Sequence, residues 1–215
     1  MKYTHSFIML HAFSMKPSDM IYYKKYLERI IPKNIKINYI YPKSPIRKIT
    51  CYDGDKYNAW FDYINEEVEN IEGEINKKHL MEQCSKIHDI LDKEVKIYNG
   101  DYSKLFLLGY SQGACMALDA GLSYNNKIGG IIGFKGHINR DIDEYFKTKQ
   151  DIWVTHGEKV KTIKLKVAEE YYDKYKKKGC DIEFLKQTNA THDAYSGIRR
   201  QIKSLKIWLD RQFIY

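Results

Sequence analysis

The segment 104–118 constrains the fold of this 215-residue chain more than any other. It runs from the apolar Leu-Phe-Leu-Leu through Gly-Tyr-Ser-Gln-Gly at 109–113 into Ala-Cys-Met-Ala-Leu. A buried strand followed at once by a turn and an apolar helical segment predicts a sharp strand-to-helix reversal. Side chains beside such a reversal would collide, so glycine at Gly109 and Gly113 suits it. Ser111 is then expected at the tip of the turn.

Short apolar runs alternate with amphipathic stretches along the rest of the chain. The runs predict strands at Phe7–Leu10, Ile35–Tyr41, Leu105–Leu108, Ile128–Gly133, Ile152–Thr155 and Ile182–Leu185. The amphipathic stretches predict helices at Asp19–Ile31, Asn76–Tyr98, Gly113–Leu122, Ile163–Lys178 and Ser196–Gln212. This alternation predicts an α/β fold with a mostly parallel central sheet and helices on both faces. The length, without a Ser/Gly-rich or Pro-rich linker, predicts one domain over 1–215.

Charge and cysteine content narrow the function classes. The formal net charge is +8, but the lysines are mixed with acidic residues. The densest run, Lys174–Lys178, is expected on a solvated helix face, so we expect no specific nucleic-acid binding and at most peripheral contact with anionic membranes. No apolar run approaches the roughly 18–20 residues of a membrane span. The four cysteines form no Cys-x-x-Cys pair, which argues against structural zinc and favours a cytoplasmic location.

A serine at the tip of a strand-to-helix turn is suited to nucleophilic catalysis. The N-terminus of the following helix adds partial positive charge, and the Gln112 N–H is expected to point at an oxyanion formed there. Because a serine hydroxyl is a poor nucleophile at its free pKa, it needs an adjacent general base. We therefore expect a histidine from another loop to reach Ser111.

Several motifs resemble the phospholipase/carboxylesterase family of small α/β-hydrolases, which includes acyl-protein thioesterases. Leu-His-Ala-Phe-Ser at 10–14 is similar to the family's Leu-His-Gly-x-Gly, and Trp-Phe-Asp at 60–62 matches a family segment. Gly-Phe-Lys-Gly at 133–136 falls where the family has Phe-Ser-Gly. The resemblance implies that the Phe13 N–H is a second oxyanion donor. It also places Trp60 beside the acyl-binding region, although a plain core role for Trp60 is equally open.

The base is expected from the order of residues in this fold, which is serine, acid, histidine. His192 follows the last predicted strand and matches the family's catalytic histidine. His156 matches a non-catalytic family histidine, and His137 lies in a different loop. His11 is interpreted as a structural residue at a strand end.

The acid is the departure from the family pattern. After His156-Gly157, the position of the family's aspartate is occupied by Val160, which cannot orient an imidazole. Three alternatives stay open: Glu158 supplies the carboxylate from a rebuilt loop, Ser111 and His192 work as a dyad, or the site is degenerate or uses an acid elsewhere. Asp193 is adjacent to His192, where its geometry is unsuited to this role.

The leading hypothesis is a serine hydrolase of carboxylic esters or thioesters, with no metal and no organic cofactor. Its expected substrates are small-molecule or lipid acyl esters and thioesters, acylated proteins included. The alternative, motivated by Val160, is a catalytically impaired binding protein on a hydrolase fold. A peripheral lipid-surface protein is a third hypothesis that rests only on the charge.

Overall fold

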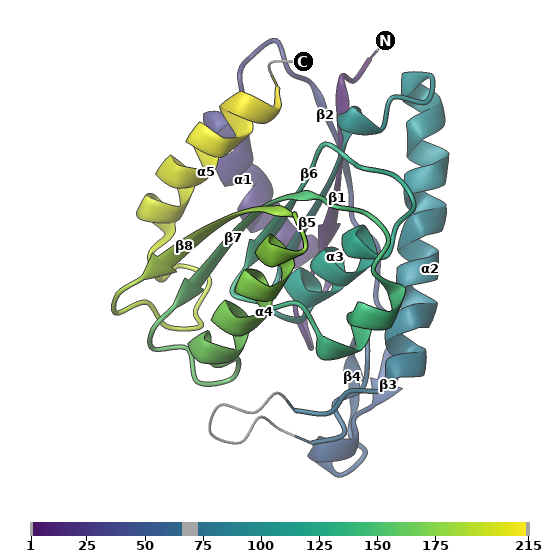
Figure 1. The fold of residues 1–215 in the computed structure, drawn as a ribbon, viewed down its shortest axis with the longest axis vertical. Helices are drawn as coiled ribbons and strands as arrows, with labels where there is room; N and C mark the ends of the chain where they lie inside the picture. The colour runs from purple at the N-terminus through teal and green to yellow at the C-terminus, as the bar shows by residue number, and fades with distance from the viewer. Residues whose placement is uncertain (1, 66–72, 214–215) are drawn as a thin grey trace.

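A six-stranded parallel sheet forms the centre of the molecule (Figure 1). The computed structural model describes residues 2–65 and 73–213. The strand order is β2-β1-β5-β6-β7-β8, with every neighbouring pair parallel. The strands are β1 (His5–Leu10), β2 (Ile37–Ile40), β5 (Leu105–Tyr110), β6 (Gly130–Phe134), β7 (Asp151–Gly157) and β8 (Asp181–Gln187). Each overlaps a predicted strand, which confirms the α/β fold class.

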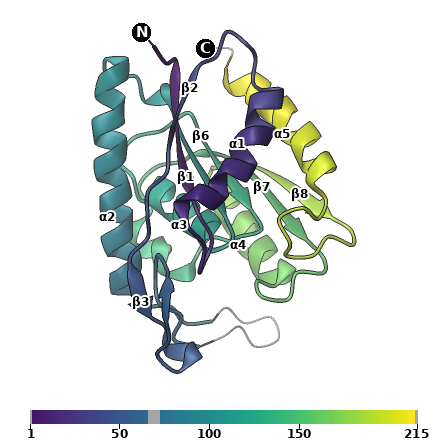
Figure 2. The same ribbon diagram turned by 180° about the vertical axis from the view of Figure 1, so that it is seen from behind.

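The α-helices of the described residues cover both faces of this sheet, as Figures 1 and 2 show from opposite sides. They are α1 (Ile21–Ile30), α2 (Lys77–Glu94), α3 (Gln112–Leu122), α4 (Leu165–Lys177) and α5 (Ile198–Gln212). The α2, α3 and α4 helices lie on one face, and α1 and α5 lie on the other. The predicted helix from Asn76 to Tyr98 ends early, because Val95–Tyr98 forms a 3-10 turn.

Two hydrophobic cores result from the alternation of side chains along the central strands. In β5, Leu105 and Leu107 belong to the core under α2, α3 and α4, whereas Phe106 and Leu108 face α1 and α5. Successive residues of a strand point to opposite faces, and here both faces are covered by helices. An uninterrupted apolar run is therefore the expected sequence of such a strand.

A small antiparallel hairpin, β3 (Ile46–Lys48) with β4 (Lys56–Asn58), was not predicted. Its strands have three residues each and contain lysine, arginine and asparagine, so no apolar alternation marks them. Below the hairpin, Asp62 accepts hydrogen bonds from the Thr50 N–H and hydroxyl, both at 2.8 Å. These contacts hold the hairpin beside the Trp-Phe-Asp segment.

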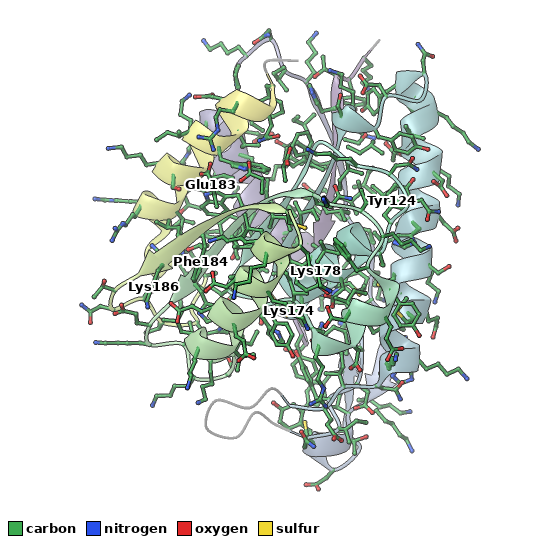
Figure 3. The ribbon with its side chains drawn as sticks, in the orientation of Figure 1. Tyr124, Lys174, Lys178, Glu183, Phe184 and Lys186 are labelled. Atoms are coloured by element: carbon green, nitrogen blue, oxygen red, sulfur yellow. The ribbon has the colours of Figure 1, made fainter. Side chains whose placement is uncertain are left out.

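The lysine run 174–178 lies at the end of α4 and is only partly a free solvated face. Lys174 and Lys178, labelled in Figure 3, both donate to the Asp143 carboxylate, with the Lys178 Nζ 2.6 Å from Oδ1. These ion pairs reduce the positive charge that the run presents to a partner. Within residues 2–65 and 73–213, none of the helices combines the length and apolar character needed to cross a bilayer.

Candidate active site

The turn between β5 and α3 has the geometry that its glycines predict. A Cβ on Gly109 would lie 2.0 Å from the Gly113 carbonyl oxygen, and one on Gly113 would lie 2.1 Å from the Leu10 carbonyl oxygen. Both glycines are therefore required by close backbone approach. Ser111 sits between them with φ 53° and ψ −123°, a backbone conformation that residues with a Cβ rarely adopt. Its N–H is anchored on the Phe134 carbonyl at 2.9 Å.

His192 reaches Ser111 from the loop that joins β8 to α5, residues 188–197, which we call the His192 loop. The Ser111 Oγ lies 2.8 Å from the His192 Nε2, a hydrogen-bond distance. The two residues are 81 positions apart and meet at the carboxyl edge of the sheet. That edge is where ligand sites of open α/β sheets lie. The structure thus brings together the two side chains that the sequence paired.

No carboxylate completes this pair in the described structure. The His192 Nδ1 is buried and has no hydrogen-bond partner among residues 2–65 and 73–213. The expectation that Glu158 takes the acid's place is corrected here, because its side chain is exposed and its backbone N–H bonds to Gln187 instead. Val160 is 5% exposed and packs in the core. The Asp193 Oδ1 accepts from the Tyr195 N–H at 2.6 Å, within the same loop.

With no carboxylate at its Nδ1 among the described residues, the pKa of His192 is set mainly by burial and by Lys135. Burial, and after it the positive charge of Lys135, lowers the pKa of His192 to about 4, while Asp193 opposes the shift. The imidazole is therefore neutral over the ordinary pH range. With Nε2 as the acceptor for the serine proton, its own proton lies on Nδ1.

The two expected oxyanion donors are backbone groups of residues near Ser111, since Gln112 follows it in the chain and Phe13 lines the same cavity. Gln112 is the first residue of α3, where the helix itself offers its N–H no acceptor. Phe13 lies after β1, and its N–H donates to no acceptor in the described residues. Ser14, at a family glycine position, has φ 60° and donates its N–H to Asn58 at 2.9 Å. Ala12, the other departure, has no positive φ, so its Cβ causes no backbone strain.

Gln112 also has a side-chain role that the sequence did not indicate. Its Oε1 accepts from the Trp60 N–H and its Nε2 donates to the Phe61 carbonyl, both at 2.9 Å. Trp60 is 2% exposed, and its Nε1 donates to the His11 carbonyl at 2.7 Å. The suggested substrate contact of Trp60 is corrected, because its indole lies in the core and its neighbour Phe61 lines the cavity instead.

A cavity of about 400 Å³ opens beside Ser111 and His192. Its described lining is mostly apolar or aromatic and includes Phe13, Met15, Tyr52, Phe61, Tyr63 and Ile163. Polar atoms come from Asn139, His137 and Lys161, and no aspartate or glutamate belongs to the described lining. A cavity of this size and character suits a ligand with an apolar portion.

The other histidines have structural environments. His11 is fully buried, its Nδ1 contacts the Ala12 carbonyl at 2.8 Å, and its Nε2 accepts from the Ser44 N–H. Burial lowers the pKa of His156 to about 3. His137 lines the cavity, and its Nδ1 lies 3.0 Å from the Ile138 carbonyl. None of the described residues forms a cluster of three or more His, Cys, Asp and Glu suited to a metal ion.

Two residues beside His192 were missed by sequence reasoning. The Tyr110 hydroxyl donates to the His192 carbonyl at 2.5 Å, and the Lys135 Nζ donates to the Asp193 and Ser196 carbonyls. Lys135 was seen only as a departure from the family's serine. No sequence pattern marks Lys135 as buried, because a lysine at the end of a strand is ordinarily exposed.

Known proteins resemble this chain over most of its length. A family model described as Phospholipase/Carboxylesterase matches residues 24–209. A probable carboxylesterase of Oryza sativa is 29% identical over 107 residues, 50% of this chain and 45% of that protein. Acyl-protein thioesterase 1 of Eremothecium gossypii is 24% identical over 135 residues, 61% of this chain and 54% of that protein. The chain thus spans about half the length of these two curated relatives.

Two longer matches support the same fold. Carboxylesterase SOBER1 of Arabidopsis thaliana is 22% identical over 181 residues, 81% of this chain and 77% of that protein. Its crystal structure superposes with a TM-score of 0.82 at 20% identity, covering 97% of this chain and 98% of that one. The crystal structure of Zea mays acyl-protein thioesterase 2 has a TM-score of 0.74 at 15% identity, covering 99% and 95%. At these identities the structural likeness shows the fold alone.

Proposed function

This chain belongs to the phospholipase/carboxylesterase family, and from its site we propose that it is a serine hydrolase of carboxylic esters or thioesters. The observation that carries the proposal is the 2.8 Å contact between Ser111 Oγ and His192 Nε2 at the tip of the strand-to-helix turn. A hydroxyl nucleophile within hydrogen-bond reach of a histidine is the arrangement that acyl transfer requires.

The reaction begins when His192 takes the Ser111 proton and the serine oxygen attacks the acyl carbonyl. The negative charge that develops on the carbonyl oxygen is held by the N–H groups of Gln112 and Phe13, which donate to no acceptor among the described residues. His192 then returns its proton to the leaving alcohol or thiol. Water, deprotonated by the same imidazole, then attacks the acyl carbon; the bond to the Ser111 oxygen breaks, the imidazolium returns its proton to that oxygen, and the carboxylic acid leaves.

Without a carboxylate at His192, and none lies there among residues 2–65 and 73–213, the reaction is expected to be slow. An acid normally orients the imidazole and stabilises the imidazolium, and disabling it in a serine protease lowers kcat by about 10⁴. We propose that Ser111 and His192 work as a dyad, because the oxyanion donors and substrate binding still act without the acid. The lowered pKa of His192 keeps the imidazole neutral when substrate arrives, but it also makes the imidazole a weaker base, which is a further reason for a slow reaction.

The proposed substrates are acyl esters or thioesters with an apolar acyl portion. The largely apolar lining of the 400 Å³ cavity beside Ser111 supports this class. Relatives are named carboxylesterases and acyl-protein thioesterases, so small-molecule esters, lipid esters and acylated proteins are all candidates. The polar rim, with Lys161 and no described carboxylate, favours neutral or anionic substrates over cationic ones.

A fluorophosphonate probe tests the nucleophile directly. The wild-type protein is expected to become labelled, whereas Ser111→Ala and heat-denatured wild type are not. Hydrolysis of p-nitrophenyl acetate and butyrate, measured with both proteins, then tests turnover. Folded wild-type protein that neither reacts with the probe nor hydrolyses these esters would refute the proposal.

A binding protein without turnover is the second candidate, favoured by the His192 Nδ1, which has no hydrogen-bond partner in the part of the chain that the structure describes. Such a protein would bind acyl ligands in the cavity but leave them intact. Isothermal titration with a non-hydrolysable acyl ketone measures binding in either case. Ester hydrolysis that is lost in Ser111→Ala would exclude this candidate.

A further inference from the structure

Lys135 is a buried cation that the reaction described above does not use. It directly follows β6 in the left-handed region, with φ 57°, and is 1% exposed. Burying an ammonium group is costly unless hydrogen bonds compensate it. Its Nζ donates to the carbonyl of Asp193 and, at 3.0 Å, to that of Ser196. Its backbone N–H is fixed on Thr155 of β7 at 2.8 Å.

These two carbonyls belong to the His192 loop. The Asp193 carbonyl is one residue beyond His192, and the Ser196 carbonyl lies just before α5 begins. The Lys135 ammonium therefore ties the segment after the histidine to the end of β6, 58 and 61 residues away in sequence. Burial, opposed only by Asp193, lowers the pKa of Lys135 to about 8, and an uncharged amine still has two N–H donors for two carbonyls.

Tyr110 holds the same loop from the neighbouring strand. Its hydroxyl donates to the His192 carbonyl at 2.5 Å. Its ring stacks on the imidazole, with centroids 5.6 Å apart and planes inclined by 25°. Because Tyr110 immediately precedes Ser111, this contact links the backbone of the nucleophile's strand to the backbone and ring of the histidine.

These contacts matter because no described residue bonds to the Nδ1 of His192. A catalytic histidine is ordinarily oriented through its Nδ1–H by a carboxylate. Here the His192 Nδ1 has no partner among the described residues, yet its Nε2 lies within hydrogen-bond distance of Ser111. The ring must therefore be oriented by contacts to its own face and to the backbone that carries it. Lys135 and Tyr110 make those contacts.

We propose that Lys135 and Tyr110 are positioning residues, which hold His192 against Ser111 through its loop backbone and ring face where an acid would otherwise act on Nδ1. The inference rests on the proposed function. Lys135 and Tyr110 would take over only the orienting part of the acid's role. They would not stabilise the imidazolium, because the nearby Lys135 cation disfavours it.

The test uses Lys135→Met, which keeps the length of the side chain and removes its donors, and Tyr110→Phe, which keeps the ring and removes the hydroxyl. With p-nitrophenyl acetate we expect kcat to fall about 10- to 100-fold in Lys135→Met, because small misplacements of a catalytic group have effects of this size. KM of Lys135→Met is expected to stay within about two-fold, since Lys135 does not belong to the described lining of the cavity that binds the ester.

Lys186→Met is the matched control. Lys186 lies on β8, which leads into the same loop, but its Nζ pairs with the Glu169 carboxylate at 2.7 Å. It is labelled in Figure 3. We expect its kcat and KM to equal those of the wild type.

A second readout does not depend on turnover. In protein labelled with ¹⁵N-histidine, the His192 imidazole, assigned with His192→Ala, is expected to give one set of signals with the proton on Nδ1. Lys135→Met is expected to shift or split this set, and Lys186→Met to leave it unchanged. Unchanged His192 signals and unchanged kcat in folded Lys135→Met and Tyr110→Phe would overturn the inference and leave the proposed function intact.

The remaining outcomes are also decisive. If wild-type protein hydrolyses no ester, the proposed function fails, and the imidazole signals still show whether Lys135 and Tyr110 orient the ring. If Lys135→Met does not fold, Tyr110→Phe and Lys135→Arg replace it. Arginine retains donors for both carbonyls, so Lys135→Arg should keep more of kcat than Tyr110→Phe, and the reverse order would count against Lys135.

Discussion

The backbone of Ser111 leads to a prediction about stability. Its φ of 53° and ψ of −123° lie outside the allowed regions of residues with a Cβ, the small left-handed region included. Glycine adopts such angles without steric cost. We therefore expect Ser111→Gly to unfold with a larger free energy than Ser111→Ala, although both variants lack the nucleophile.

The comparison of these two variants isolates the backbone. Both lose the 2.8 Å hydrogen bond to His192, worth about 0.5–1.5 kcal/mol, so it cancels in the difference. A residue held in a sparsely populated conformation costs about 1–3 kcal/mol. About 0.5–1 kcal/mol of this gain is offset in the glycine variant, because glycine loses more conformational freedom on folding. At the midpoints of these two ranges, the net advantage of glycine over alanine is about 1 kcal/mol.

Urea unfolding followed by circular dichroism at pH 7.5 measures this difference. In a chain of this length it corresponds to a shift in Tm of roughly 2–4 °C, the effect of about 1 kcal/mol. Ser204, inside α5, is the matched control. There glycine should be less stable than alanine by about 1 kcal/mol. A Ser111→Gly variant no more stable than Ser111→Ala would refute strain at this turn.

Three further predictions concern the acid position, the base and the turn. Val160→Asp is expected to raise kcat about 10-fold or more relative to Val160→Asn, because a carboxylate at this position would orient and stabilise the imidazolium; equal kcat values would contradict the assignment of Val160 to the acid's place. The acid limb of kcat/KM should have its midpoint near pH 4, because His192 becomes protonated there and activity is lost as the pH falls. A midpoint near 6.5 would show that burial does not depress the pKa of His192. Gly113→Ala should lower the free energy of unfolding by about 3 kcal/mol or more, since its Cβ would lie 2.1 Å from the Leu10 carbonyl oxygen, and urea unfolding measures the loss.

The central sheet and the strand-to-helix turn are predictable from the sequence because their signals are local. The β5 strand is buried on both faces, so its sequence is an unbroken apolar run. The turn at Ser111 requires two residues without a Cβ at fixed spacing, and Gly109 and Gly113 meet that requirement in the sequence itself. His192 was predicted differently, from the order of serine, acid and histidine in this fold and from its match to the family's histidine.

The surroundings of His192 were decided only by the tertiary structure. Whether Glu158 reaches the imidazole depends on the path of one loop, and that path leaves its side chain in solvent. The sequence was equally compatible with a core position and a cavity position for Trp60. Its hydrogen bond to the His11 carbonyl places it in the core. The contact of Lys135 with the His192 loop joins residues 58 positions apart, for which no periodic pattern exists. Strand and helix periodicity determines which residues are buried, but the loops at the carboxyl ends of the strands determine which polar groups meet there.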